Sequence, residues 1–154
     1  MKKILHFDSP REPYISDAAV VWCFDSRFFN AFRKLLKRLG VNYADRIRLA
    51  GGAKCLASPD DPSDQEFVLK QIRISIALHQ TRRVILMTHS DCGAYGGLDG
   101  GFGGDTRLEV QKHTEELRKA AATVRTNFPH VQVDAYFIDF EGVWEVDVGA
   151  TAQA

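Results

Sequence analysis

Two segments with a continuous apolar run stand out along the chain. They are AAVVWCF at 18–24 and RVILMTH at 83–89, and neither shows the alternation that marks a half-buried strand. Continuous runs of this length are typical of strands buried on both faces of a sheet. A shorter segment, DRIRLAGG at 45–52, predicts a further strand that ends in a glycine turn.

Three other segments carry apolar residues at helical spacing, which predicts amphipathic helices. They are residues 28–40, 65–80 and 105–128. Gly40 is a natural C-cap for the first helix, and Asp64 is the expected N-cap of the second. Asp105 or Thr106 is expected to cap the third helix.

The C-terminal residues 131–148 predict two strands around a turn at Glu141-Gly142. The elements therefore follow the order strand, helix, strand, helix, strand, helix, strand, strand. Strands that alternate with helices predict an α/β fold with a mostly parallel sheet flanked by helices.

An N-terminal extension precedes these elements. KILHF at 3–7 is a candidate short edge strand, and DSPREPYISD at 8–17 contains two prolines and indicates a loop. We therefore expect a single domain over residues 1–154, with 1–17 as a strand and loop extension.

Composition narrows the class of protein. The 154 residues are 45% hydrophobic and 26% charged, as in an ordinary globular domain. Lys and Arg together equal Asp and Glu at 20 each, so nothing indicates a nucleic-acid partner. No stretch is apolar enough to span a membrane, and the N-terminal apolar run is too short for a signal peptide. With only three cysteines, we expect a reducing, cytoplasmic location.

Residues suited to chemistry lie at the ends of the predicted strands. Cys23 ends the first apolar strand, the turn at 50–52 ends the next, and His89 ends the third. Ligands of such sheets bind beyond the carboxyl ends of the strands, which meet at one edge. We therefore expect a functional site at that edge.

Cys23, His89 and Cys92 would form a Cys2His set there. Thiolates and a neutral imidazole are the ligands that Zn²⁺ prefers, and three protein ligands leave the fourth position open, as in catalytic sites. Cys55 is a less favoured fourth ligand because it lies past the glycine turn. Cys23 alone would be interpreted as a buried core residue.

Asp25 and Arg27 follow Cys23 closely. Asp25 could be the fourth ligand, or it could accept a proton of a zinc-bound water whose pKa the metal lowers towards neutrality. A guanidinium can hold such a carboxylate through two parallel hydrogen bonds and keep it ionised. The pair could instead be a structural ion pair at a strand end, and Arg48 could add positive potential at this edge.

The glycine-rich stretch Gly93–Gly104 and the other histidines receive no catalytic role. The stretch lacks the Lys-Ser/Thr ending of a P-loop, so we expect a mobile or tightly turned loop over the site rather than a phosphate site. The remaining histidines are expected to be surface or half-buried residues: His6, His79, His113 and His130.

This constellation resembles the β-class carbonic anhydrases. That family carries a Cys-x-Asp-Ser-Arg motif, then an Arg-x-Ala-Gly turn, then His-x-x-Cys-Gly. In this chain the same order is found as Cys23-Phe24-Asp25-Ser26-Arg27, Arg48-Leu49-Ala50-Gly51-Gly52 and His89-Ser90-Asp91-Cys92-Gly93. The resemblance runs from about Ala18 to Val148. Leu49 and Gly52 replace frequent asparagines and the helical N-terminal arm is missing, which suggests a compact branch of the family.

The resemblance implies an α/β fold whose last strand is an antiparallel edge. It implies a Zn²⁺ enzyme that hydrates CO2 to bicarbonate through zinc-bound hydroxide, with Cys23, His89 and Cys92 as ligands and Asp25 and Arg27 as a catalytic dyad. It also implies a homodimer or a dimer of dimers. Two alternatives stay open: a zinc hydrolase of carbon disulfide or carbonyl sulfide, and a non-catalytic zinc- or anion-binding module.

Overall fold

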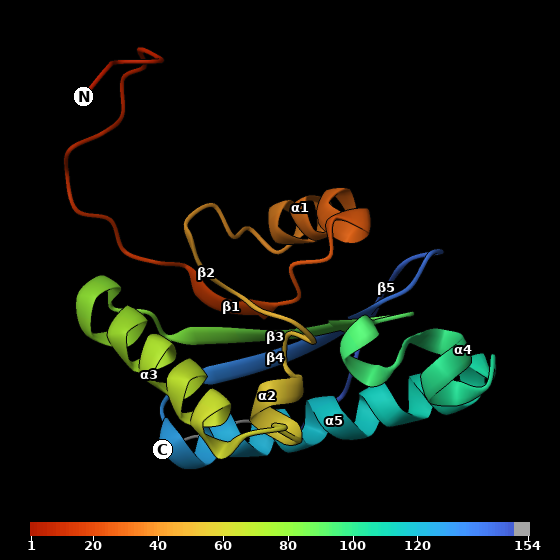
Figure 1. Ribbon diagram of the computed structural model, residues 1–154. Helices are drawn as coiled ribbons and strands as arrows, with labels where there is room; N and C mark the ends of the chain where they lie inside the picture. Colours follow the sequence, from red (N-terminus) through yellow and green to blue (C-terminus); the bar gives the residue numbers. More distant parts are fainter. Residues whose placement is uncertain (150–154) are drawn as a thin grey trace.

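A computed structural model describes residues 1–149 and contains a five-stranded sheet with the order β2-β1-β3-β4-β5 (Figure 1). The strands are β1 Ala18–Trp22, β2 Ala44–Arg48, β3 Arg83–His89, β4 Gln132–Ile138 and β5 Val143–Glu145. All neighbouring pairs are parallel except β4 and β5, which are antiparallel. The expected mostly parallel α/β sheet with an antiparallel C-terminal edge is confirmed.

Helices cover both faces of this sheet. They are α1 Phe29–Arg38, α2 Lys54–Ala57, α3 Pro62–His79, α4 Gly97–Phe102 and α5 Thr106–Asn127, with short 3-10 turns η1 Ser26–Phe28 and η2 Gly93–Tyr95. α1 lies on one face, and α2, α3 and α5 lie on the other (Figure 1). The three predicted helices are present. α2 and α4 were not predicted, because four and six residues are too few to show a helical period.

Burial on both faces explains the continuous apolar pattern of β1. Ala19 and Val21 point into the layer beneath α3 and α5, whereas Val20 and Trp22 point towards α1. All five residues of β1 have no exposed surface. The ring of Trp22 stacks on that of Phe32 from α1, with 5.6 Å between centroids.

The N-terminal extension corrects one expectation. Residues 3–7 form no strand, and the described residues before β1 contain neither strand nor helix. The segment extends away from the sheet (Figure 1), and Ile4, Leu5 and Phe7 are exposed. A strand requires a paired neighbour, and this segment has no sheet edge beside it. Its first backbone bond to the body is donated by Ser16 N to His79 O, at 2.9 Å.

The start of α3 corrects a second expectation. The N-cap is Asp61 rather than Asp64, because an Asp61 carboxylate oxygen accepts from Ser63 N at 2.8 Å. Pro62 takes the first helical position, where its missing N–H costs nothing. Asp64 lies in the first turn. Asp105 caps α5 as expected, accepting from Arg107 N.

His113 also differs from the expectation. It is wholly buried in α5 rather than at the surface or half-buried, and neither ring nitrogen has a hydrogen-bond partner among the described residues. Burial lowers the pKa of His113 to about 4, so the ring is neutral at physiological pH.

No helix in the described part of the chain combines the length and apolarity needed to cross a bilayer.

The turn after β2 brings backbone segments into close contact beside Cys23. Gly52 has φ +56°, and a Cβ placed there would lie 2.5 Å from Met87 O and 2.9 Å from Cys23 N. Ala53 N donates to Met87 O at 3.2 Å, which ties the turn to β3. Only glycine meets both the left-handed conformation and this spacing.

We expect Gly52→Ala to lower the free energy of unfolding by roughly 3 kcal/mol or more, because strain and overpacking act together. Gly40→Ala is the matched control, since Gly40 also has a positive φ but nothing lies within 4 Å of its Cβ position. That control should lose about 1 kcal/mol. Urea unfolding of both variants measures the difference, and equal losses would contradict the close contact.

Candidate metal centre

Three metal-type ligands converge at the carboxyl edge of the sheet. Cys23 directly follows β1, His89 is the last residue of β3, and Cys92 precedes η2. Because β1 and β3 are parallel neighbours, their ends lie side by side. The ligand atoms of the three residues lie within 4.8 Å of one another, and all three side chains are buried.

The imidazole of His89 is oriented by the backbone. Its Nδ1 lies 2.8 Å from Ser90 O, and a carbonyl can only accept, so Nδ1 carries the proton. Nε2 then presents a lone pair, yet it is buried and has no hydrogen-bond partner among the described residues. A buried nitrogen left without a partner is unusual and requires an explanation. Metal-ligating histidines show this arrangement, with one nitrogen on a carbonyl and the other on the metal.

The two sulfur atoms shift each other's pKa in opposite directions. A hydrogen bond from the Cys92 thiol is the main reason that the pKa of Cys23 is lowered to about 4, against the opposing effect of burial. The pKa of Cys92 is raised, because its proton is held in that hydrogen bond and because the thiol is buried. Cys23 is therefore the sulfur that ionises more readily, and it lies beside a second sulfur and Nε2 of His89. This donor set fits Zn²⁺.

Cys55 lies outside this group. Its thiol donates to Gly52 O at 3.2 Å, and its side chain belongs to the apolar layer beneath α3 and α5. Burial raises the pKa of Cys55 to about 12, so it stays a thiol. Arg48, at the end of β2, is exposed and has no ion-pair partner within residues 1–149.

Asp25 and Arg27 form a close ion pair beside the ligands. Arg27 Nη2 donates to Asp25 Oδ2 at 2.7 Å, and Arg27 Nε donates to the same oxygen at 3.0 Å. Asp25 Oδ1 accepts from the Arg27 backbone N at 2.9 Å, which caps η1. The hydrogen bonds from Arg27 hold the pKa of Asp25 below its usual range. Asp25 Oδ2 lies 4.0 Å from His89 Nε2, so the carboxylate faces the ligand group.

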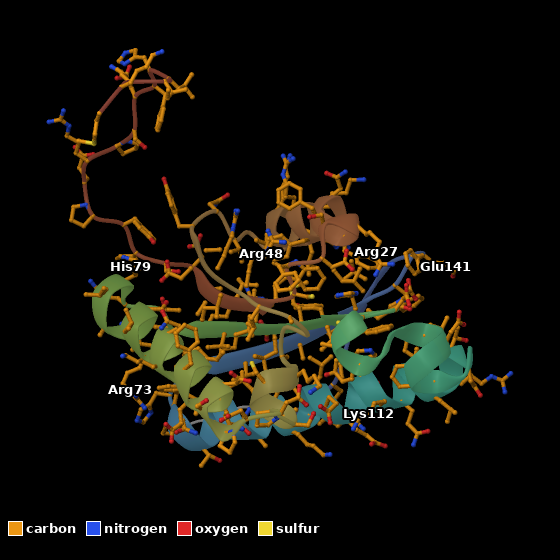
Figure 2. All side chains as sticks on the ribbon, in the orientation of Figure 1. Arg27, Arg48, Arg73, His79, Lys112 and Glu141 are labelled. Carbon is orange, nitrogen blue, oxygen red and sulfur yellow. The ribbon has the colours of Figure 1, made fainter. Side chains whose placement is uncertain are left out.

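The Asp25–Arg27 ion pair and His79 lie at opposite ends of the sheet. Arg27 is seen at the end where β3 stops, whereas His79 lies at the opposite end (Figure 2). His79 bonds Asp45 there, with 2.8 Å between Nδ1 and Oδ2. His79 is therefore not part of the ligand group.

Two further acidic residues belong to the site and received no role from the sequence. Asp91 Oδ2 accepts from Arg27 Nη1 at 2.8 Å, on the side of the guanidinium away from Asp25. Glu109 of α5 is buried and accepts from Ser90 Oγ at 2.5 Å and from Asp91 N at 2.6 Å. The aspartate within His-x-x-Cys was a visible signal for Asp91. No sequence pattern indicated Glu109, because its position depends on how α5 packs.

The glycine-rich stretch is not a loop. It forms η2 and α4, which are joined by Gly96, and Gly96 and the first residue of α4, Gly97, have φ of +88° and +71°. A Cβ on Gly101 would lie 2.1 Å from Tyr95 O, so α4 packs backbone against backbone on η2. The stretch is tightly turned, as one of the two alternatives expected, but it also contains a short helix because these glycines allow α4 to approach η2 closely.

Comparison with known proteins gives three findings beside this geometry. An uncharacterized protein of Rickettsia bellii is 29% identical over 128 residues, which cover 82% of this chain and 78% of the relative. The β-carbonic anhydrase isoform I of Trichomonas vaginalis superposes with a TM-score of 0.61 at 15% identity, covering 95% of this chain and 89% of that one. The carbonic anhydrase of Streptococcus mutans gives 0.60 at 20% identity, covering 91% and 88%. At these identities the two structures show that the fold is shared.

A family model described as "Putative carbonic anhydrase" matches residues 16–148. This span runs from just before β1 to beyond β5 and contains every residue of the ligand group and of the ion pair. With a match over most of its length, the chain belongs to this carbonic anhydrase family.

Proposed function

We propose that this protein is a zinc-dependent carbonic anhydrase that hydrates CO2 reversibly to bicarbonate. The observation that carries the proposal is the convergence of Cys23, His89 and Cys92 next to the Asp25–Arg27 pair. Membership of the family supports it at the level of the fold.

The ligands would be the sulfur atoms of Cys23 and Cys92 and Nε2 of His89. A zinc ion held there would supply the Lewis acidity that makes a water molecule acidic near neutral pH. Asp25 either fills the fourth position or leaves it open for solvent. The 4.0 Å between Asp25 Oδ2 and His89 Nε2 places the carboxylate close enough for both alternatives.

Asp25 acts as a hydrogen-bond acceptor at the reacting position. Its lowered pKa keeps it ionised at physiological pH, so it can only accept. The ionised carboxylate accepts at Oδ2 only from a molecule at the reacting position that still carries a proton. The hydrogen bond then fixes the direction of that molecule's O–H bond. Arg27 holds the carboxylate in this orientation through Nη2 and Nε. Such fixed acceptors favour reaction because the reacting groups need not reorganise.

The surroundings of the pair suit a small apolar substrate. The Arg27 guanidinium lies 5.7 Å from the centroids of both the Phe28 and Phe140 rings. Phe140 is 66% exposed, so an aromatic side chain lies at the surface next to the charged pair. CO2 has no hydrogen to donate and would be held there by contact with apolar surface.

The proposal also covers the assembly and location of a single catalytic domain. Phe24, Phe140 and Trp144 are exposed aromatic residues that a homodimer or a dimer of dimers would cover. All three cysteines are free, which suits the reducing cytoplasm.

A stopped-flow CO2 hydration assay on zinc-loaded protein above neutral pH tests the proposed function. We expect catalysis that disappears when a chelator removes the zinc. If the protein hydrolyses carbon disulfide or carbonyl sulfide but does not hydrate CO2, the proposed substrate CO2 is wrong and the sulfur compound takes its place. Zinc-loaded protein that is inactive towards all three substrates would indicate a non-catalytic binding module.

Cys92→Ser should lose both zinc and activity, because an alcohol replaces a thiolate ligand. Cys55→Ser is the matched control, since Cys55 is equally buried but only donates to Gly52 O, a bond that serine can also make. Metal analysis of both purified variants gives the comparison. Zinc retained by Cys92→Ser at about one per chain would disprove the ligand assignment.

Arg27→Ala should lower kcat/KM by roughly 10- to 100-fold while zinc content stays near one per chain, because Arg27 orients Asp25 and is not a ligand. Arg38→Ala, which removes an exposed arginine of α1, should leave both quantities unchanged. Activity and zinc are measured on the same preparations. Loss of zinc from Arg27→Ala would mean that Arg27 supports the fold of the site instead.

A further inference from the structure

The Arg27 guanidinium donates hydrogen bonds on two sides, to Asp25 and to Asp91. Towards the ligand group it donates to Asp25 through Nη2 and Nε, at 2.7 Å and 3.0 Å to Oδ2. On the other side Nη1 donates to Asp91 Oδ2 at 2.8 Å, and Nη2 donates to the carbonyl oxygen of Asp91 at 3.0 Å. Nη1 has no other hydrogen-bond partner among the described residues. One planar cation therefore bridges two carboxylates.

Asp91 is itself held in an uncommon backbone conformation. Its φ of +52° lies in the left-handed region, which costs an ordinary residue about 1 kcal/mol or more and is tolerated best by Asn and Asp. This conformation aims the side chain and the carbonyl oxygen of one residue at the same guanidinium. Strained residues of this kind persist where the surrounding structure holds them, often at functional sites.

Two contacts fix Asp91 from behind. Glu109 is 1% exposed and accepts from Asp91 N at 2.6 Å, which fastens the loop to α5. Asp91 Oδ1 accepts from Leu98 N at 2.9 Å, in the first turn of α4. The carboxylate thus has one oxygen on α4 and the other on Arg27.

We propose that Asp91 is a positioning residue, which holds Arg27 in the place from which Arg27 orients Asp25. A chain of hydrogen bonds connects the buried Glu109 to Asp91, Asp91 to Arg27, and Arg27 to Asp25. This inference rests on the proposed function, since it assigns a role within the same site.

Flexibility of the Arg27 side chain is the physical reason that a second hydrogen-bonding partner matters. The Arg27 side chain is 46% exposed, and Asp25 is only two residues away along the same backbone. An arginine side chain retains about 2 kcal/mol of rotamer entropy when free, so one exposed partner fixes it poorly. A second carboxylate fixed to other elements removes that freedom and keeps the Asp25 carboxylate facing His89.

A structural role for Asp91 makes a different prediction. If Asp91 only capped α4, its charge would be unimportant, and asparagine would serve as well. In Asp91→Asn the amide oxygen can still accept from Leu98 N, but the NH2 group then faces Nη1 of Arg27 and cannot accept. The substitution therefore separates the bond to Arg27 from the bond to α4.

The first measurement uses metal-free, ¹⁵N-labelled protein and needs no catalysis. The Arg27 Nε–H resonance, identified by its loss in Arg27→Ala, should exchange with solvent roughly tenfold faster in Asp91→Asn, because the Nε–H bond to Asp25 opens more often once the Nη1 bond to Asp91 is lost. Asp61→Asn is the matched control, because it makes the same change at the N-cap of α3. Unchanged exchange in Asp91→Asn would overturn the proposal.

The second measurement is a double-mutant cycle on zinc-loaded protein. Asp91→Asn should lower kcat roughly tenfold with zinc content and KM unchanged. In the Arg27→Ala background the same substitution should have no further effect, because Asp91 acts through Arg27. Additive losses would overturn the proposal. Absence of CO2 hydration in the unaltered protein would refute the proposed function, while the exchange measurement still decides the role of Asp91.

Discussion

The parallel pairing of β1 with β3 is the constraint on which the candidate site depends. The register sets Val20 opposite Ile85 and Val21 opposite Leu86, so Cys23, directly after β1, lies beside the last residues of β3, which ends at His89. Because both faces of β1 are buried, a slip of one residue would exchange its two sets of side chains between unlike apolar layers. The position of Cys23 relative to His89 is therefore determined by packing along the whole strand.

Beside the ligand group, the carboxyl groups have an opposite charge or a hydrogen-bond donor next to them. Asp25 and Asp91 share Arg27, and the buried Glu109 accepts from a backbone N–H and from a hydroxyl. Such pairing is needed because an isolated charge removed from water is very unfavourable. By contrast, His89 Nε2 lacks a partner within the described chain, and this is the atom that faces the two cysteine sulfurs.

Glycine allows close backbone contact on both sides of the ligand group. Gly52 lets the turn after β2 touch the backbone at Cys23, and Gly101 lets α4 touch the backbone at Tyr95. In both places the contact is between main-chain atoms, so no larger side chain would fit. Glycines within α4 have little intrinsic helical preference, and the helix forms there because it packs on its neighbours.

The sequence by itself determined the order of elements, the parallel sheet and the edge at which the ligands meet. These follow from local patterns: continuous apolar runs mark doubly buried strands, and Cys23 and His89 stand where such runs end. Asp25 and Arg27 could be predicted from the sequence for the same reason, since they are close together in the chain. The strand predicted at 3–7 and the loop predicted at 93–104 differ from the structure because both concern segments whose structure depends on what lies beside them.

Only the tertiary structure decided which groups support the ligands from a distance. Glu109 lies on a helix with an ordinary amphipathic pattern, and its burial against the loop at 90–91 depends on how that helix packs. The second hydrogen-bonding partner of Arg27, Asp91, likewise has to adopt a positive φ. Sequence patterns report the average environment of a segment, whereas a hydrogen bond between distant segments depends on distances that are set when the whole fold is formed.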